Sequence, residues 1–166
     1  MRSETVDQVL ESVASSGSGP GSAAALHTAL GSAFVARAVG PNGGRTAEIA
    51  DDLRGAALRL AAEGSGADPV AGARAAVRVL EVAERALGLA ETLRPGDRGV
   101  GAADVAAAAE ALRAAVGTAR VEVEVHLAGI ADPAVREELL LAVDPVDDVV
   151  LRAAKVTAVV REQLLR

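Results

Sequence analysis

Three Asp-Pro pairs divide the sequence, at Asp68-Pro69, Asp132-Pro133 and Asp144-Pro145. An aspartate at the N-cap accepts a hydrogen bond from a backbone amide that has no helical partner, and a proline at the next position removes an amide that would be unpaired. We therefore expect a helix to begin at each pair. After Pro69 and Pro145 the apolar residues recur every three or four positions, which indicates helices with one buried face.

The other segments predict helices as well. Their expected ranges are 5–15, 22–39, 46–62 and a further helix that begins near Asp104. The stretch Val121–Leu127 (VEVEVHL) alternates with a period of two, as a half-buried strand would, but the chain has no second strand candidate with which it could pair. We therefore predict an all-α protein: a single domain over residues 1–166, folded as an antiparallel bundle of six or seven helices.

The core of this bundle must be built from small side chains. Hydrophobic residues make up 51% of the chain, yet it has one Phe, one Met and neither Trp nor Tyr, which leaves Ala, Val and Leu. Ser22, Ala25, Ala29 and Ala33 form a row of small residues, so their helix should lie close against a neighbour or a twin subunit. Because such a core is thin, we predict a homodimer with Leu and Val faces as the seam.

The composition argues against several classes of function. With no cysteine, two histidines and no HExxH sequence, the chain offers no metal site. A formal net charge of −6 disfavours a nucleic acid partner, because such binding depends on clustered cations. The first residues lack the apolar region of a signal peptide, and no run of about 18 uncharged apolar residues could cross a membrane. We expect a cytoplasmic protein without a membrane partner.

A loop rich in glycine and serine, SSGSGPGS (Ser15–Ser22), precedes the alanine-rich segment. It is not a P-loop, because that motif needs a lysine after its glycines and the only lysine of the chain is Lys155. Nor is it a dinucleotide-binding turn, which follows a strand rather than a helix. Two interpretations stay open: a plain connection with Ser22 as the N-cap of the next helix, or a loop that contacts a ligand.

Residues 5–34 resemble the opening of the cyclodeaminase/cyclohydrolase family, which comprises the folate enzymes formiminotetrahydrofolate cyclodeaminase and methenyltetrahydrofolate cyclohydrolase. Its members begin with a short helix, a TPGGGS loop and an Ala/Gly-rich helix. Gly19, Gly21 and Ser22 match the first glycine, the last glycine and the serine of that loop, and Pro20 replaces its middle glycine.

A second block, residues 101–132, is similar to a later helix of the same family. Asp104 falls on the family's aspartate, and His126 falls on an asparagine that precedes a leucine. The blocks occur in the family's order. The chain departs from the family between its third and fourth helices, where Leu60 runs through AAEGSGADPV almost directly into the next helix and an extra helical stretch is missing.

The resemblance implies an enzyme that closes, or opens with water, a one-carbon bridge between two folate nitrogens. No metal or organic cofactor is implied, and a folate derivative would be the substrate. The reaction needs proton transfer, which a positioned acid or base typically accelerates about 10²- to 10⁴-fold. The expected catalytic residues are Asp104 and His126, and Glu122, one turn before His126, would hold one imidazole tautomer and favour its protonated form. The expected substrate-binding residues are Gly19, Gly21, Ser22 and His27.

Simpler interpretations stay open for these side chains. Asp104 could be an N-cap, Glu122 and His126 could be a solvent-facing pair, and His27, which lies one turn before Gly31, could face the surface. The alternative function is a non-catalytic helical dimer that keeps the scaffold as a binding or structural subunit.

Overall fold

Apart from the segment 5–15, the helices expected from the sequence are present in the structure, a computed structural model that describes residues 20–63, 68–93 and 100–165 together with residues 8, 10, 11, 14 and 15. All regular structure in these residues is helical, so the all-α prediction is confirmed, including for VEVEVHL. The helices are α2 (Pro20–Val39), α3 (Gly44–Glu63), α4 (Pro69–Thr92), α5 (Ala102–Leu127), α6 (Pro133–Val143) and α7 (Val146–Leu164). Much of the short helix expected over residues 5–15 lies outside the described residues.

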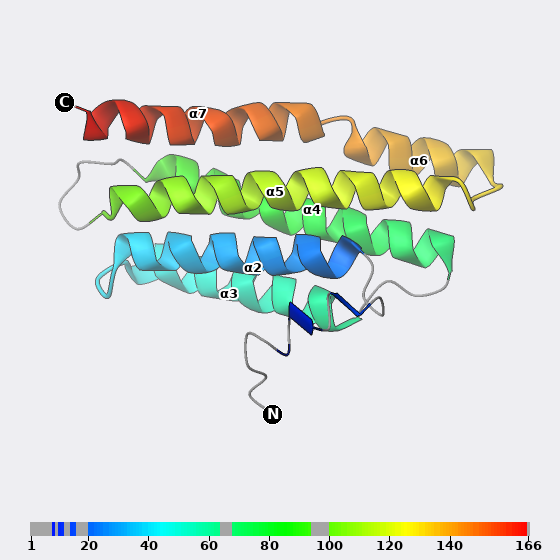
Figure 1. Ribbon diagram of the computed structural model, residues 1–166, viewed down its shortest axis with the longest axis horizontal. Helices are drawn as coiled ribbons and strands as arrows, with labels where there is room; N and C mark the ends of the chain where they lie inside the picture. Colours follow the sequence, from blue (N-terminus) through cyan, green and yellow to red (C-terminus); the bar gives the residue numbers. More distant parts are fainter. Residues whose placement is uncertain are drawn as a thin grey trace.

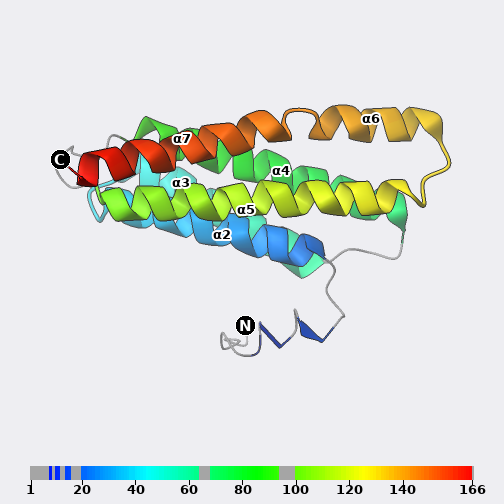
Figure 2. The ribbon, with the colours of Figure 1, turned by 45° about the horizontal axis from the view of Figure 1, so that its top comes forward.

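The described helices pack as a bundle with α5 at its centre. Figures 1 and 2 show α5 beside α2 and α7, with α4 packed behind it, while the short α6 continues the row of α7. Helix α2 runs antiparallel to α5, since the amide of Gly101 before α5 donates to the carbonyl of Ala38 at the end of α2 over 2.8 Å. None of the helices in the described part of the chain combines the length and apolar character needed to cross a bilayer.

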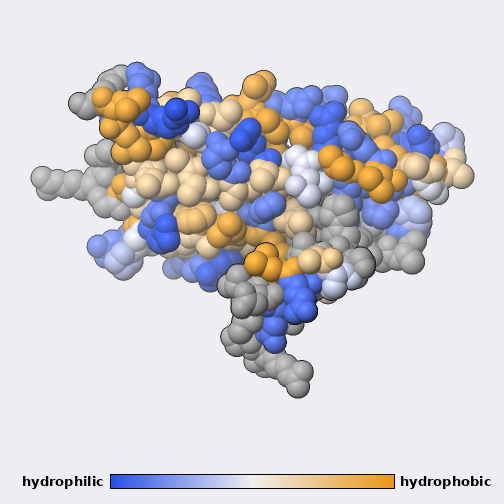
Figure 3. All heavy atoms as spheres, viewed as in Figure 1, coloured by the Kyte–Doolittle hydropathy of each residue, from blue (hydrophilic) through white to orange (hydrophobic). Residues whose placement is uncertain are grey.

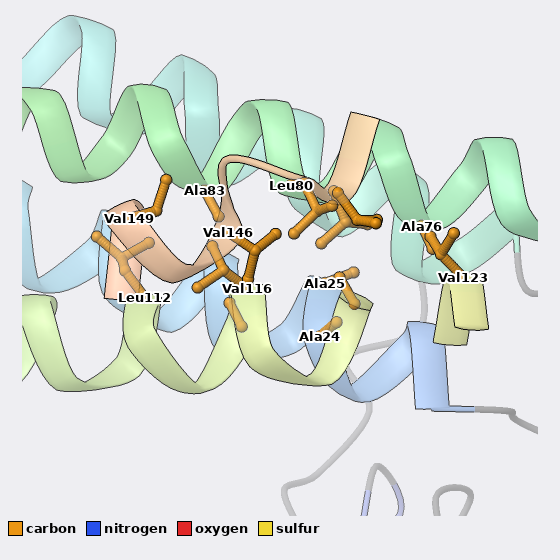
Figure 4. Close-up of a cluster of buried hydrophobic side chains, with 14 of the residues drawn as sticks. Ala24, Ala25, Ala76, Leu80, Ala83, Leu112, Val116, Val123, Val146 and Val149 are labelled. Carbon is orange, nitrogen blue, oxygen red and sulfur yellow. The ribbon is translucent and has the colours of Figure 1, made fainter. Parts of the chain in front are cut away.

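Small side chains allow these helices to approach closely. Figure 4 shows alanines of α2 and α4 meeting leucines and valines of α4, α5 and α7 in one buried cluster. Between α2 and α5 the approach requires a glycine: a Cβ on Gly31 would lie 2.6 Å from Cγ of Leu112 and 3.3 Å from the carbonyl oxygen of Ala108. The space beside Gly31 is therefore filled by Leu112.

Two of the three Asp-Pro pairs cap helices as predicted. Asp68 accepts hydrogen bonds from the amides of Val70 and Ala71 at 3.3 and 3.2 Å, and Asp132 accepts one from Ala134 at 2.9 Å. Both aspartates have extended backbone, with ψ of 118° and 115°. The N-cap prediction for Asp144 is wrong. This residue is the helical C-cap of α6, with ψ of −41°, because α6 runs almost directly into α7.

Replacing the two kinds of aspartate should therefore have different effects on stability. Asp132→Ala removes a capping hydrogen bond and is expected to lower the free energy of unfolding by about 1 kcal/mol. Asp144→Ala removes no cap and is expected to change it by less than about 0.5 kcal/mol. Urea denaturation monitored by circular dichroism measures both, and equal losses for the two variants would contradict the assigned caps.

Candidate functional site

Within one chain the predicted site residues that the structure describes do not gather in one place. Gly21 and Ser22 belong to the first turn of α2, and Gly19 lies outside the described residues. Asp104 lies in the first turn of α5, beside Arg37 in the last turn of α2. At 1.5 Å per residue, the α2 segment from Ser22 to Arg37 spans about 22 Å. The two segments expected to contribute to one substrate site, the first turn of α2 and the start of α5, therefore lie at opposite ends of α2 within one chain (Figure 1).

Ser22 is not the N-cap of α2, which was the simpler interpretation of this residue. Helix α2 begins at Pro20, so Ser22 is its third residue and not its N-cap. The helix begins at Pro20 because proline has a φ angle suited to the first position of a helix, where its missing amide is not needed.

Asp104 makes an ion pair and a hydrogen bond with Arg37. Its side chain is 20% exposed, and a Cβ on Gly101 would lie 2.9 Å from its Oδ2 atom. The N-cap of α5 is Gly101, which lacks a capping side chain, so the N-cap interpretation of Asp104 is wrong. The guanidinium of Arg37 also lies 4.9 Å from the ring centre of Phe34. The hydrogen bond that Arg37 donates to Asp104, together with the negative charge of Asp104, raises the pKa of Arg37.

Glu122 and His126 form the pair that the sequence placed one helical turn apart. Glu122 is buried, at 2% exposure, and the His126 side chain is 19% exposed. Glu122 Oε1 lies 3.8 Å from His126 Nε2, which is longer than a hydrogen bond. The solvent-facing interpretation of this pair is wrong. A buried carboxylate next to an imidazole can favour one orientation of the ring.

Residues at the start of α4 and at the end of α5 surround His126. A Cβ on Gly72 would lie 2.4 Å from His126 Nε2, so only glycine leaves room for the ring. Beyond the ring, Arg136 of α6 donates to the carbonyls of Leu127 and Ile130 and so holds the last turn of α5. The sequence reasoning missed Gly72 and Arg136. The signal for Gly72 is a glycine inside a strongly helical segment, which usually has a packing reason.

His27 lies away from this pair. Gly31, one turn further along α2, packs against Leu112, so His27 is level with the middle of α5 and roughly 18 Å from His126 along the bundle. The His27 side chain is partly exposed, and its Nδ1 atom is buried without a hydrogen-bond partner among the described residues. His27 and His126 therefore do not share one site within a chain.

A cavity of about 270 Å³ lies between α4, α5 and α7. Arg152 borders this cavity and donates hydrogen bonds to Glu91 and Glu84. These hydrogen bonds raise the pKa of the Arg152 guanidinium. The described lining contains none of the residues predicted to form a site. It consists of Ala90, Glu91, Leu93, Val105, Arg152, Lys155, Val156 and Val159.

The described residues contain no group of three or more His, Asp or Glu side chains that could hold a metal ion. No family model matches the sequence, and a search of the curated proteins finds no match.

Proposed function

We propose that the protein is a cofactor-independent acid/base enzyme of the cyclodeaminase/cyclohydrolase type. Its substrate would be a folate one-carbon unit, such as methenyl- or formimino-tetrahydrofolate, or a related small molecule that is cyclised or hydrolysed. The observation that carries the proposal is the buried carboxylate of Glu122 next to the imidazole of His126. This pair lies in the last turns of α5, at the end of the bundle where α2 begins with Gly21 and Ser22 in its first turn (Figure 1).

In the hydrolytic reaction the imidazole of His126 would act as the base. It takes a proton from water as the water oxygen bonds to the bridging carbon, and the bond from that carbon to one folate nitrogen breaks when the nitrogen is protonated. Glu122 would orient the imidazole and stabilise the imidazolium that forms. The amides of the first turn of α2 would lie at the positive end of a helix dipole, where they favour an electron-rich group of the substrate.

Isothermal titration calorimetry with tetrahydrofolate and with its 5-formyl and 5,10-methenyl forms tests the substrate class. We expect saturable heat with at least one of the three, and weaker binding to the Gly72→Ala variant because its methyl group displaces the ring of His126. An absence of heat with all three compounds would remove folates as substrates.

One observation favours a second function, a non-catalytic helical dimer. The outer sides of α2 and α5 carry large apolar residues in contact with solvent: Leu30 is 49% exposed, Val121 51% and Val125 62%. A surface of this kind is typical of a protein interface. The two functions are separable, because a dimer can form with or without turnover.

A further inference from the structure

The cavity of about 270 Å³ between α4, α5 and α7 has apolar walls. Ala90 of α4 and Val105 of α5 line it and are themselves 0% and 1% exposed, so they belong to the interior of the bundle. Leu93, Val156 and Val159 complete the apolar part of the lining. An apolar group that enters this space leaves water for apolar surroundings, which is favourable.

The side of α7 that borders the cavity carries charge as well. Its lining residues stand at positions 152, 155, 156 and 159, a spacing that follows one side of a helix. Two of them are the cations Arg152 and Lys155, and the other two are valines. Figure 3 shows apolar and charged residues next to each other along the upper edge of the molecule, where α7 lies. A molecule in the cavity therefore meets both apolar walls and charged side chains.

Arg152 already has its partners. Its Nε and Nη2 atoms donate to the two carboxylate oxygens of Glu91 over 3.0 and 2.7 Å, and its Nη1 atom donates to Glu84 over 2.9 Å. A guanidinium that binds a carboxylate through two parallel hydrogen bonds makes a strong pair. A bound molecule would have to break these bonds before it could pair with Arg152 or Glu91.

Lys155 brings a charge to the cavity that has no such partner. It is the only lysine of the chain, its side chain is exposed, and within the described part of the chain it forms no hydrogen bond or ion pair. The residues one turn away on α7, at positions 151, 152, 158 and 159, are Leu, Arg, Ala and Val, so its own helix offers it no acidic neighbour. Lys155 therefore presents an ammonium group with three donors beside an apolar cavity.

We propose that this cavity binds a small apolar carboxylate, whose carboxylate accepts hydrogen bonds from the ammonium of Lys155 and whose body lies between the apolar walls. The volume sets the size of the molecule. At about 30 Å³ per water, the cavity equals the space of about nine waters, so a molecule of about ten non-hydrogen atoms fits.

The charges around the cavity select a monoanion. One ammonium group can balance one carboxylate, whereas the carboxylates of Glu84 and Glu91 near Arg152 would repel the second charge of a phosphate dianion. A cation gains no free partner there, because both oxygens of Glu91 accept hydrogen bonds from Arg152.

This cavity is separate from the Glu122–His126 pair. Val105 and Glu122 lie on the same helix and are 17 residues apart, which is about 26 Å along α5. The inference therefore goes beyond the proposed function. Binding in the cavity can be measured whether or not the protein acts on a folate.

Isothermal titration calorimetry with octanoate tests the proposal, because octanoate has a single carboxylate and the expected size. We expect saturable heat with one site per chain and a dissociation constant of about 1 mM. Octylamine, and 1-octanol titrated to the limit of its solubility, have the same chain without the negative charge and should bind at least about tenfold more weakly. No saturable heat up to about 10 mM octanoate, or equal affinity for octanoate and 1-octanol, would overturn the proposal.

Two variants of α7 locate the site. Lys155→Gln removes the charge and should weaken octanoate binding by about tenfold or more. Val159→Glu places a carboxylate on the cavity wall one turn after Lys155, where it should abolish binding because it pairs with the ammonium and repels octanoate. Val159 is 41% exposed, so the fold should tolerate this change. Unchanged affinity in either variant, shown to be folded by circular dichroism, would refute the assignment of the cavity.

Arg161→Gln and Leu164→Glu are the matched controls. Both residues lie on α7 outside the described lining of the cavity, and Leu164 is 66% exposed. These variants should bind octanoate as the wild type does, and so should Glu122→Gln, which alters only the proposed catalytic pair. A wild type that binds octanoate but turns over no folate would refute the proposed function alone.

Discussion

His126→Gln is expected to lower the turnover of a folate one-carbon substrate by at least about 10²-fold, because glutamine cannot exchange a proton near neutral pH. Glu122→Gln should cause a similar loss, since the amide keeps the shape of the buried carboxylate but removes its charge. The measurement is the absorbance change of methenyltetrahydrofolate during hydrolysis, with circular dichroism to confirm that each variant is folded.

Glu124→Gln is the matched control for the carboxylate. Glu124 lies two residues from Glu122 on the same helix, but its side chain is 50% exposed and binds Arg120. The control should retain most of the turnover. If Glu122→Gln is as active as Glu124→Gln, the buried carboxylate has no part in the chemistry and the acid/base proposal fails.

Gly72→Ala tests whether the observed position of the His126 imidazole is needed for turnover. The new methyl group would come within 2.4 Å of His126 Nε2, so the ring must turn away. The ring lies at the end of a side chain that can rotate, so we expect a small change in stability and a large fall in turnover. Unchanged turnover in this variant would mean that the observed position of the ring is not the active one.

Gly31→Leu is expected to cause the largest loss of stability, about 3 kcal/mol in the free energy of unfolding. Even a Cβ at this position would overlap Leu112, and the nearby carbonyl oxygen of Ala108 belongs to the backbone of α5 and cannot turn aside. The two helices would have to separate, and the alanines between them would lose their contacts.

Gly88→Leu makes the same chemical change where there is room. A Cβ on Gly88 of α4 would have no atom within 4 Å among those described. Leucine also favours the helix over glycine by up to about 1 kcal/mol, so this variant should be as stable as the wild type or more so. Urea denaturation compares the two variants. Equal stabilities would contradict the close packing of α2 on α5.

Features set by neighbouring residues could be predicted from the sequence. Asp68 and Asp132 cap helices because a cap depends on the next two or three amides. The stretch Val121–Leu127 is helical despite its alternation, since the chain offered it no second strand. Asp144 shows the limit of this reasoning: the same dipeptide caps no helix where two helices follow each other directly.

Features that depend on distant segments could not be predicted. Both α2 and α5 are rich in alanine on every side, so their periodicity does not show which faces meet or in which direction the helices run. The sequence therefore did not show that the end of α2 lies beside the start of α5. As a result, Asp104 lies beside Arg37 rather than near the glycine turn. In the same way, Arg152 of α7 binds Glu84 and Glu91 of α4, which lie 68 and 61 residues earlier in the chain.

The most direct test of the acid/base site is the nitrogen-15 NMR spectrum of the two histidines, recorded during titration with methenyltetrahydrofolate. The chain has only His27 and His126, and the spectrum of a His27→Gln variant assigns the two rings. We expect the ring nitrogens of His126 to shift and saturate while those of His27 stay in place. Ring signals of His126 that do not move in the presence of excess ligand would contradict the assignment of this end of the bundle as the active site.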